Sequence, residues 1–366
     1  MQSIVDKHVG DGTVPGALGL VARGTDVRIA VAGDGIAPDS IFRIASITKP
    51  ITAAAVMLLI QDGRIALTDP IRKWLPELAE PMVVRTADSP VDDVVPAERP
   101  IIVFDLLTFR AGYGFPDRFD LPAVQLMATE LGGDGREVQR PPKPDEWMAK
   151  LARVPLVCQP GEQWLYNTSS DLQGVLIARV SGQSLPDFLA DRVFAPLGML
   201  DTGFSVPTAK LDRVPNYYRH TQDGFELADR PDGQWATPPA FPSGAGGLVS
   251  TASDWLAFAR MLLADGGDLL SAESVRMMTT DHLTAAQRAG STLFLEGQGW
   301  GFGGSVDVAA VDPWNVPGRY GWVGGTGTAG HIIPSTGTAT ILFTQVAMAG
   351  PTSPPLMRDF WRYAAG

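Results

Sequence analysis

The chain has 366 residues, of which 45% are hydrophobic and 19% charged, as in a globular protein with a large core. A formal net charge of −11 argues against the basic surfaces that bind nucleic acids or anionic membranes. The single cysteine excludes an intrachain disulfide and any metal site built on several cysteines.

The beginning of the chain predicts a helix followed by two strands. Residues 1–15 favour a helix that ends near Gly10, and residues 17–22 and 27–32 favour short strands joined by a tight turn. The same segment lacks the basic and apolar regions of a secretory signal. The longest apolar run, residues 51–60, is too short to cross a bilayer. We therefore expect a cytoplasmic protein without a membrane partner.

An all-apolar helix is predicted from about Ile47 to Gln61, with Pro50 tolerated in its first turn. Such a helix belongs in the centre of a protein. Ser46 and Lys49 stand at its start, three residues apart and so on one face. There a hydroxyl can attack a carbonyl, and a free backbone N–H can stabilise the oxyanion. A buried lysine of lowered pKa can accept the hydroxyl proton. The S-x-x-K tetrad alone is a weak signal, which this helix strengthens.

The middle of the chain predicts helices separated by long irregular segments. Cys158 precedes a Gln-Pro-Gly turn with no histidine near it in sequence, so we interpret it as a structural residue. The expected segments, in order, are an exposed loop at 78–100, a short helix from 104, a lid or surface excursion at 112–145, mainly helix at 164–200, an irregular aromatic-rich stretch at 207–242 and a helix at 253–264.

The end of the chain returns to strands. Residues 295–346 favour strands with glycine turns, ending in a strand at 338–344, and residues 355–364 favour a final helix. Strands at both ends with helices between predict an α+β fold, an antiparallel sheet flanked by helices and built from both chain ends. We expect residues 1–70 and 245–366 to form this sheet domain. Residues 71–244 are expected to form an inserted, mainly helical domain with lid-like loops.

Two further stretches contain candidate site residues. Tyr166 stands just before a predicted helix, where it is either a general acid or base, or a core tyrosine with a satisfied hydroxyl. Residues 321–328 are rich in glycine, which suits either oxyanion donors or a plain tight turn. His331 follows this stretch and either lines a pocket or is structural. The four histidines lack metal-ligand spacing, so no metal is expected.

Taken together, these stretches resemble the serine β-lactamase-like superfamily, most closely the class C β-lactamases and the family VIII carboxylesterases. The likeness extends over nearly the whole chain. The similar motifs occur in the family's order: Ser46-Ile47-Thr48-Lys49 (S-x-x-K), 67–70 (LTDP) with 75–77 (LPE), 106–112 (LLTFRAG), 160–166 (PGEQWLY), 194–199 (FAPLGM) and 246–251 (GGLVST).

The resemblance implies a two-step acyl transfer. Ser46 would be the nucleophile, and its proton would pass toward Lys49 and Tyr166. The backbone N–H groups of Ser46 and Gly325 would form the oxyanion hole, with Gly325 assigned by its place after Trp322-Val323-Gly324. The resemblance implies a small-molecule substrate and no metal or organic cofactor.

Two departures from the β-lactamase pattern concern the substrate. The third position of the family's Y-x-N motif is Thr168 here, and Asn167 stands beside it. The family's K-T-G motif is a W-x-G, from Trp322 to Gly324. Its lysine attracts the antibiotic's carboxylate, and an indole cannot replace that charge. Asp171, five residues after the tyrosine, is similar to the esterase branch. We therefore expect the site to bind a neutral ester, through Asn167, Thr168, Trp322 and Gly324.

The predicted function is thus a serine hydrolase that cleaves small neutral carboxylic esters through an acyl-enzyme on Ser46. One alternative is a β-lactamase or D-amino-acid peptidase. Another is an acyltransferase on the same scaffold, with an alcohol or amine in place of water. A third is a non-catalytic binding protein, against which the intact Ser46, Lys49 and Tyr166 argue.

Overall fold

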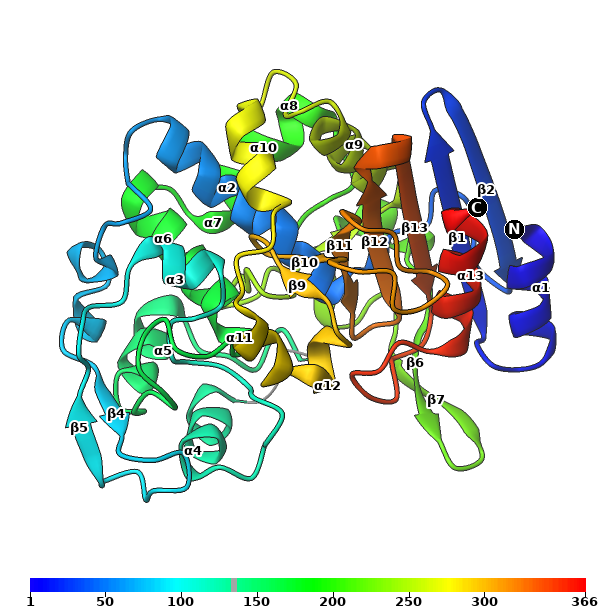
Figure 1. Cartoon of the computed structure of the whole chain (residues 1–366). Helices are drawn as coiled ribbons and strands as arrows, with labels where there is room; N and C mark the ends of the chain where they lie inside the picture. The colour runs from blue at the N-terminus through cyan, green and yellow to red at the C-terminus, as the bar shows by residue number, and fades with distance from the viewer. Residues whose placement is uncertain (133–136) are drawn as a thin grey trace.

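The computed structural model describes residues 1–132 and 137–366 (Figure 1). Within them one large sheet has the order β2-β1-β13-β12-β11-β10-β9, with every neighbouring pair antiparallel. Two strands come from the start of the chain and the others from its end, as the sequence predicts. The strands are β1 (Gly16–Arg23), β2 (Asp26–Gly33), β9 (Gly299–Trp300), β10 (Ser305–Val306), β11 (Tyr320–Gly324), β12 (Thr328–Ile333) and β13 (Thr338–Thr344).

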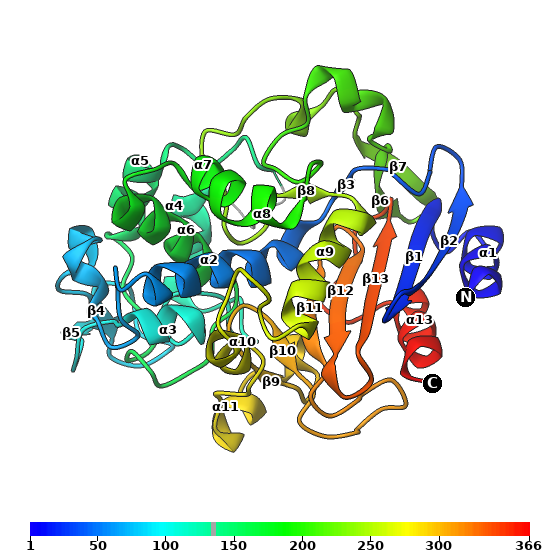
Figure 2. The same cartoon turned by 90° about the horizontal axis from the view of Figure 1, so that it is seen from above.

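Helices cover both faces of this sheet, as Figure 2 shows. The terminal helices α1 (Gln2–Gly10) and α13 (Pro355–Ala365) lie on one face, and α9 (Ala252–Leu263) lies on the other. Two glycines permit the close packing. A Cβ on Gly19 of β1 would come within 2.9 Å of the Phe360 ring, and one on Gly330 of β12 within 2.5 Å of Trp255. The expected α+β architecture is therefore confirmed.

Helix α2 (Lys49–Gln61) runs through the middle of the molecule (Figure 1). Every residue from Lys49 to Leu59 is buried, as the absence of a polar face predicts. The helix begins slightly later than the expected Ile47. Ser46 lies in a separate 3₁₀ turn, Ala45–Thr48, and the α-helix begins only at Lys49. The nucleophile candidate is therefore held by a tight turn, whereas the lysine belongs to the rigid helix.

The middle of the chain is mainly helical, but two stretches expected to be irregular contain hairpins. Residues 82–96 form β4 (Met82–Val84) and β5 (Val94–Pro96), and residues 217–229 form β6 (Tyr217–Thr221) and β7 (Gly224–Asp229). Paired valines favour the first hairpin. The second turns at Gln222-Asp223, and Gly224, which follows, has a φ of +131° that suits glycine. The remaining elements are β3 (Phe42–Arg43), α3 (Val103–Leu107), α4 (Pro122–Leu131), α5 (Pro144–Leu151), α6 (Thr168–Ser181), α7 (Leu185–Leu189), α8 (Ala195–Leu197), β8 (Val249–Ser250), α10 (Ala272–Met278), α11 (Ala285–Ala289) and α12 (Thr292–Leu295).

The stretch 112–145 includes residues 133–136, which lie outside the described residues, and its described part contributes α4 and the start of α5. Cys158 is buried, and burial raises the pKa of its thiol to about 12, as suits a structural cysteine. No helix in the described part of the chain is both long and apolar enough to cross a membrane.

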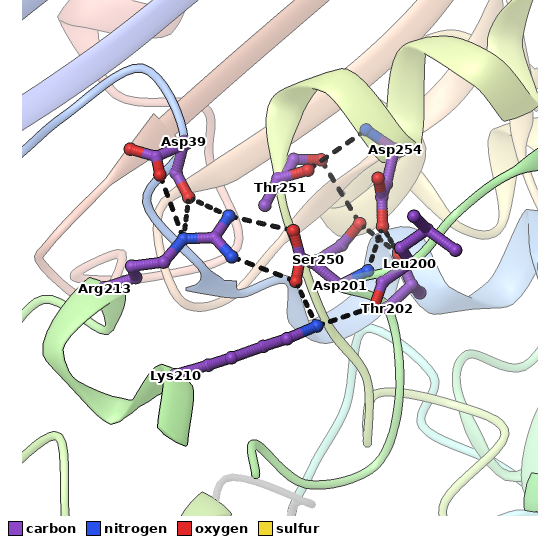
Figure 3. Close-up of polar contacts among 9 residues, drawn as sticks. All are labelled: Asp39, Leu200, Asp201, Thr202, Lys210, Arg213, Ser250, Thr251 and Asp254. Atoms are coloured by element: carbon purple, nitrogen blue, oxygen red, sulfur yellow. Dashed lines mark hydrogen bonds and ion pairs between the residues drawn. The ribbon is translucent and has the colours of Figure 1, made fainter. Parts of the chain in front are cut away.

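A polar network holds the segment that leads to Ser46 (Figure 3). The Arg213 guanidinium donates to both carboxylate oxygens of Asp201, at 3.0 and 2.8 Å, and to the backbone carbonyl of Asp39 at 2.6 Å. Asp254, near the start of α9, accepts the backbone N–H of Asp201 at 2.7 Å. The network therefore ties the chain before Ser46 to a helix packed on the sheet.

Candidate active site

Ser46 and Lys49 lie together where the 3₁₀ turn meets α2. The Lys49 Nζ donates to the Ser46 Oγ at 2.8 Å and to the Ala245 carbonyl at 2.6 Å. Burial of the whole lysine side chain lowers its pKa from 10.5 to about 7, although the nearby Asp171 carboxylate opposes this change. A neutral amine is therefore accessible near pH 7, beside a half-buried hydroxyl from which it can take a proton.

The backbone around Ser46 is strained and closely packed. Ala45 has a φ of +44°, a left-handed conformation that alanine rarely adopts. Ser46 is the second residue of its 3₁₀ turn, so its N–H has no acceptor within the turn. Gly324 packs against this segment, since a Cβ there would lie 2.5 Å from the Ile44 carbonyl. Gly325 follows and lines the same cleft as Ser46, so the two expected oxyanion donors lie on one cavity.

Two threonines that the sequence did not single out fasten the glycine-rich turn to this segment. The Thr326 hydroxyl donates to the Arg43 carbonyl at 2.6 Å, and the Thr328 hydroxyl donates to the Ile44 carbonyl at 2.8 Å. Both carbonyls belong to residues just before Ser46. The turn between β11 and β12 is therefore more than a plain β-turn, because its side chains set the position of the serine segment.

Tyr166, the third expected catalytic residue, lies beside Lys49. Its hydroxyl accepts a hydrogen bond from the Trp322 Nε1 at 2.8 Å, and its ring centroid lies 4.7 Å from the Lys49 Nζ. The ring stacks on Phe294 with centroids 4.6 Å apart. Burial raises the pKa of Tyr166 to about 12, while hydrogen bonds with Ser46 and Trp322 oppose the rise. The phenol therefore keeps its proton near pH 7 and is suited to pass or donate it.

Trp322, which is expected to bind the ester, is largely buried among other aromatic side chains. Its side chain is only 3% exposed and packs edge to face on Trp300, with ring centroids 4.7 Å apart. Its one polar side-chain atom, Nε1, donates the hydrogen bond to the Tyr166 hydroxyl. Trp322 still lines the cleft, but its main contacts support the tyrosine rather than present a broad surface to a substrate.

The residue after the tyrosine forms a strained turn that leads into α6. Asn167 has φ +83° and ψ −68°, and the Thr168 N–H donates to the Tyr166 carbonyl at 3.2 Å. These are the features of a γ-turn, which is costly for a residue other than glycine. The turn places Asn167 on the cleft. Thr168 is buried beside Met127 in a small side cavity, so it does not line the main cleft.

The cleft in front of Ser46 has a volume of about 580 Å³, within the usual range for small-molecule sites. In the described part of the chain its one charged lining residue is Arg140, which pairs with Glu137 at 2.7 Å. His331 lies elsewhere, buried against Trp361, which favours the structural interpretation of this histidine. The principal side chains on the cleft are Ser46, Phe115, Phe119, Tyr166, Asn167, Trp235, Phe294, Trp322 and Met348.

Comparison with known proteins shows the family of the chain. The Beta-lactamase family model matches residues 1–355, so the chain belongs to this family. Protein Rv1367c of Mycobacterium tuberculosis is 40% identical over 316 residues, covering 83% of this chain and 77% of the relative. Esterase EstB of Burkholderia gladioli is 29% identical over 382 residues, covering 97% and 92%.

Solved structures show the same fold. That of EstCE1, described as a hydrolase with promiscuous acyltransferase activity, matches with a TM-score of 0.80 at 23% identity and covers 100% of this chain and 97% of the other. The protein therefore has the serine β-lactamase-like fold, close to the family VIII esterases. It is a hydrolase of that fold, with esterase and acyltransferase relatives.

Proposed function

We propose that the protein is a serine hydrolase that cleaves small neutral carboxylic esters through an acyl-enzyme on Ser46. The observation that carries the proposal is the 2.8 Å hydrogen bond between the Lys49 Nζ and the Ser46 Oγ, at the wall of a largely uncharged cleft. A serine paired with a lysine whose pKa lies near 7 is an activated nucleophile.

The reaction follows from these contacts. As the Ser46 Oγ attacks the ester carbonyl, its proton passes to Lys49, and the backbone N–H groups of Ser46 and Gly325 stabilise the oxyanion. Collapse of the tetrahedral intermediate breaks the bond to the alcohol. Tyr166 donates its proton to the departing oxygen and regains one from Lys49. Water then repeats the sequence on the acyl-enzyme, releasing the acid and restoring the serine.

The charge of the site supports a neutral substrate. The W-x-G motif supplies no cation, and Trp322 is occupied with Tyr166. Arg140 at the cleft already has Glu137 as its partner. The net charge of −11 gives an anion no general attraction. An anionic lactam would therefore meet no free cation among the described residues that line the cleft.

The test is a comparison of kcat/KM for p-nitrophenyl butyrate and nitrocefin. We expect the ester to react better by about two orders of magnitude, the effect of one missing charge-assisted contact of about 2–3 kcal/mol. A D-alanine ester serves as a probe for peptidase activity. Equal turnover of nitrocefin would contradict the proposal and support the β-lactamase alternative, while preference for the D-alanine ester would support the peptidase.

An acyltransferase is the second candidate, because the cleft of about 580 Å³ has room for an organic acceptor besides a short acyl group. The relative EstCE1, with its promiscuous acyltransferase activity, favours the same possibility. Adding an alcohol such as 1-butanol to the ester assay distinguishes the two. Butyl butyrate as the main product indicates transfer, and butyric acid as the main product indicates hydrolysis.

Tyr166→Phe is expected to lower kcat by about 10²- to 10⁴-fold, the usual contribution of a positioned acid or base. The phenyl ring keeps its stack on Phe294, so Tm is expected to stay near that of the wild type. Steady-state kinetics and thermal denaturation of the same preparations check both points. Normal ester turnover by this variant would make Tyr166 an ordinary core residue.

Trp322→Phe is expected to lower kcat about tenfold with little change in KM for short esters, because it removes the N–H that donates to Tyr166. It also removes part of a buried ring, a loss that the control shares. Trp300→Phe is the matched control. Trp300 is buried against Trp322, and its own Nε1 has no hydrogen-bond partner among the described residues. If Trp322→Phe instead leaves kcat unchanged and raises KM more for esters with longer acyl chains, Trp322 acts by contacting the substrate.

A further inference from the structure

Asp171, in the first turns of α6, sends its side chain away from its own helix. Its Oδ1 accepts hydrogen bonds from the Ser243 Oγ at 2.6 Å and from the Ala245 N–H at 3.1 Å. It makes no direct ion pair within the described residues. An acidic residue near a helix start usually serves that helix's own N–H groups. Asp171 instead holds a loop more than seventy residues further along the chain.

That loop, residues 243–246, lies between α6 and α2 and is hydrogen-bonded to side chains of both helices. The Ser243 Oγ, having donated to Asp171, accepts the N–H groups of Ala245 and Gly246 at 3.2 and 3.1 Å. On the other side of the loop, the Ala245 carbonyl accepts the Lys49 Nζ at 2.6 Å. The backbone of Ala245 therefore meets Asp171 through its N–H and Lys49 through its carbonyl.

The loop has little freedom to adjust. The Gly244 carbonyl accepts the Thr52 hydroxyl of α2 at 2.8 Å. A Cβ on Gly244 would lie 2.5 Å from the Ser170 carbonyl of α6. The loop is therefore wedged between the two helices, and a change in how Asp171 holds it would move the carbonyl that fixes Lys49.

We infer that Asp171 is the positioning residue for the lysine that activates Ser46, acting through the loop 243–246 and through its own negative charge. The inference rests on the proposed function. Asp171 places the Ala245 carbonyl so that the Lys49 Nζ points at the Ser46 Oγ. Its carboxylate also stabilises the protonated lysine that forms when Ser46 attacks.

The charge of Asp171 acts on the pKa of Lys49 in the direction that this role requires. Burial lowers the pKa of Lys49, and the Asp171 carboxylate raises it in part. The same burial raises the pKa of Asp171, while Ser243, Lys49 and the Ala245 N–H oppose that rise. The other titratable group that faces the amine is the Tyr166 phenol, which stays neutral near pH 7. Removing the carboxylate charge is therefore expected to lower the pKa of Lys49 further.

Two substitutions separate the charge from the hydrogen bonds. Asp171→Asn keeps an oxygen that can accept from Ser243 and Ala245 but has no charge, whereas Asp171→Ala removes both. The primary measurement is NMR titration of protein labelled with 13C at the lysine ε-carbons, with the Lys49 signal identified by its loss in Lys49→Met. The midpoint in Asp171→Asn is expected about one pH unit below that of the wild type.

Kinetics give the second measurement. At its optimal pH Asp171→Asn is expected to keep kcat within about tenfold of the wild type, whereas Asp171→Ala is expected to lose at least about 100-fold. An unchanged Lys49 midpoint in Asp171→Asn, or equal kcat for both variants, would overturn the inference and leave Asp171 a structural residue. If no ester is hydrolysed by the wild type, the proposed function fails, but the titration still decides the role of Asp171.

Discussion

Replacing Ser46 with alanine is expected to lower kcat for p-nitrophenyl butyrate by about 10⁴- to 10⁶-fold, the loss typical of removing a nucleophile. The substitution removes one half-buried oxygen at the wall of the cleft. Lys49 keeps its other partner, the Ala245 carbonyl, so no buried cation is left without a hydrogen bond. The fold is therefore expected to survive, and circular dichroism and Tm check this.

Ser169→Ala is the matched control for this experiment. Ser169 lies in the first turn of α6, is fully buried, and its hydroxyl has no hydrogen-bond partner among the described residues. Its replacement is expected to leave kcat nearly unchanged. If Ser46→Ala retains more than about 1% of the wild-type kcat, a group other than this serine performs the attack.

Lys49→Arg is expected to be nearly inactive, with kcat lower by about 10³-fold or more. Guanidinium keeps its charge at all accessible pH values, so it cannot take the Ser46 proton. It is also too large for a site in which the lysine is fully buried. Lys49→Met separates these two causes, since its unbranched side chain is similar in length and has no basic group. Both variants are expected to lack ester turnover.

Stability gives an independent measurement on the same variants. The pKa of Lys49 is about 7 in the folded protein and 10.5 in the unfolded chain. The unfolded state therefore binds the proton more tightly, so the lysine costs stability below pH 10.5, and the cost is greatest below pH 7. Lys49→Met removes this cost, and its Tm at pH 7 is expected to equal or exceed that of the wild type.

The pH dependence of the wild type follows from the same pKa. Because Lys49 must be neutral to accept a proton, kcat/KM is expected to rise with pH through a midpoint near 7. A profile flat from pH 5 to 9, or an active Lys49→Arg variant, would show that the residue acts as a fixed positive charge rather than as a base.

Much of the fold could be predicted because its signals are local. The apolar run of α2, the short strand-favouring runs at both ends of the chain and the Ser46–Lys49 spacing all depend on neighbouring residues. The hairpin at 217–229 is not predicted, although Asp223-Gly224 is a turn signal and the neighbouring Tyr217, Tyr218 and Phe225 favour strands. The many Pro, Asp and Gly residues of the stretch 207–242 favour irregular structure instead.

The rest of the site depends on contacts between distant residues. The Lys49 amine meets a carbonyl 196 residues away, and the Trp322 indole meets a hydroxyl 156 residues away. No local pattern encodes such pairs, so the supporting roles of Trp322, Thr326 and Thr328 emerged only from the folded chain. The positive φ angles of Ala45 and Asn167 are likewise imposed by packing, since neither residue favours them.

The most direct test of the central claim is to treat the protein with a fluorophosphonate and map the modified residue by mass spectrometry. In this reaction the serine oxygen bonds to phosphorus, fluoride departs, and the serine proton passes to the base. The account predicts one phosphonyl group per chain, on Ser46, with loss of ester hydrolysis and no labelling of Ser46→Ala. Labelling of another residue, or full ester hydrolysis without labelling, would contradict it.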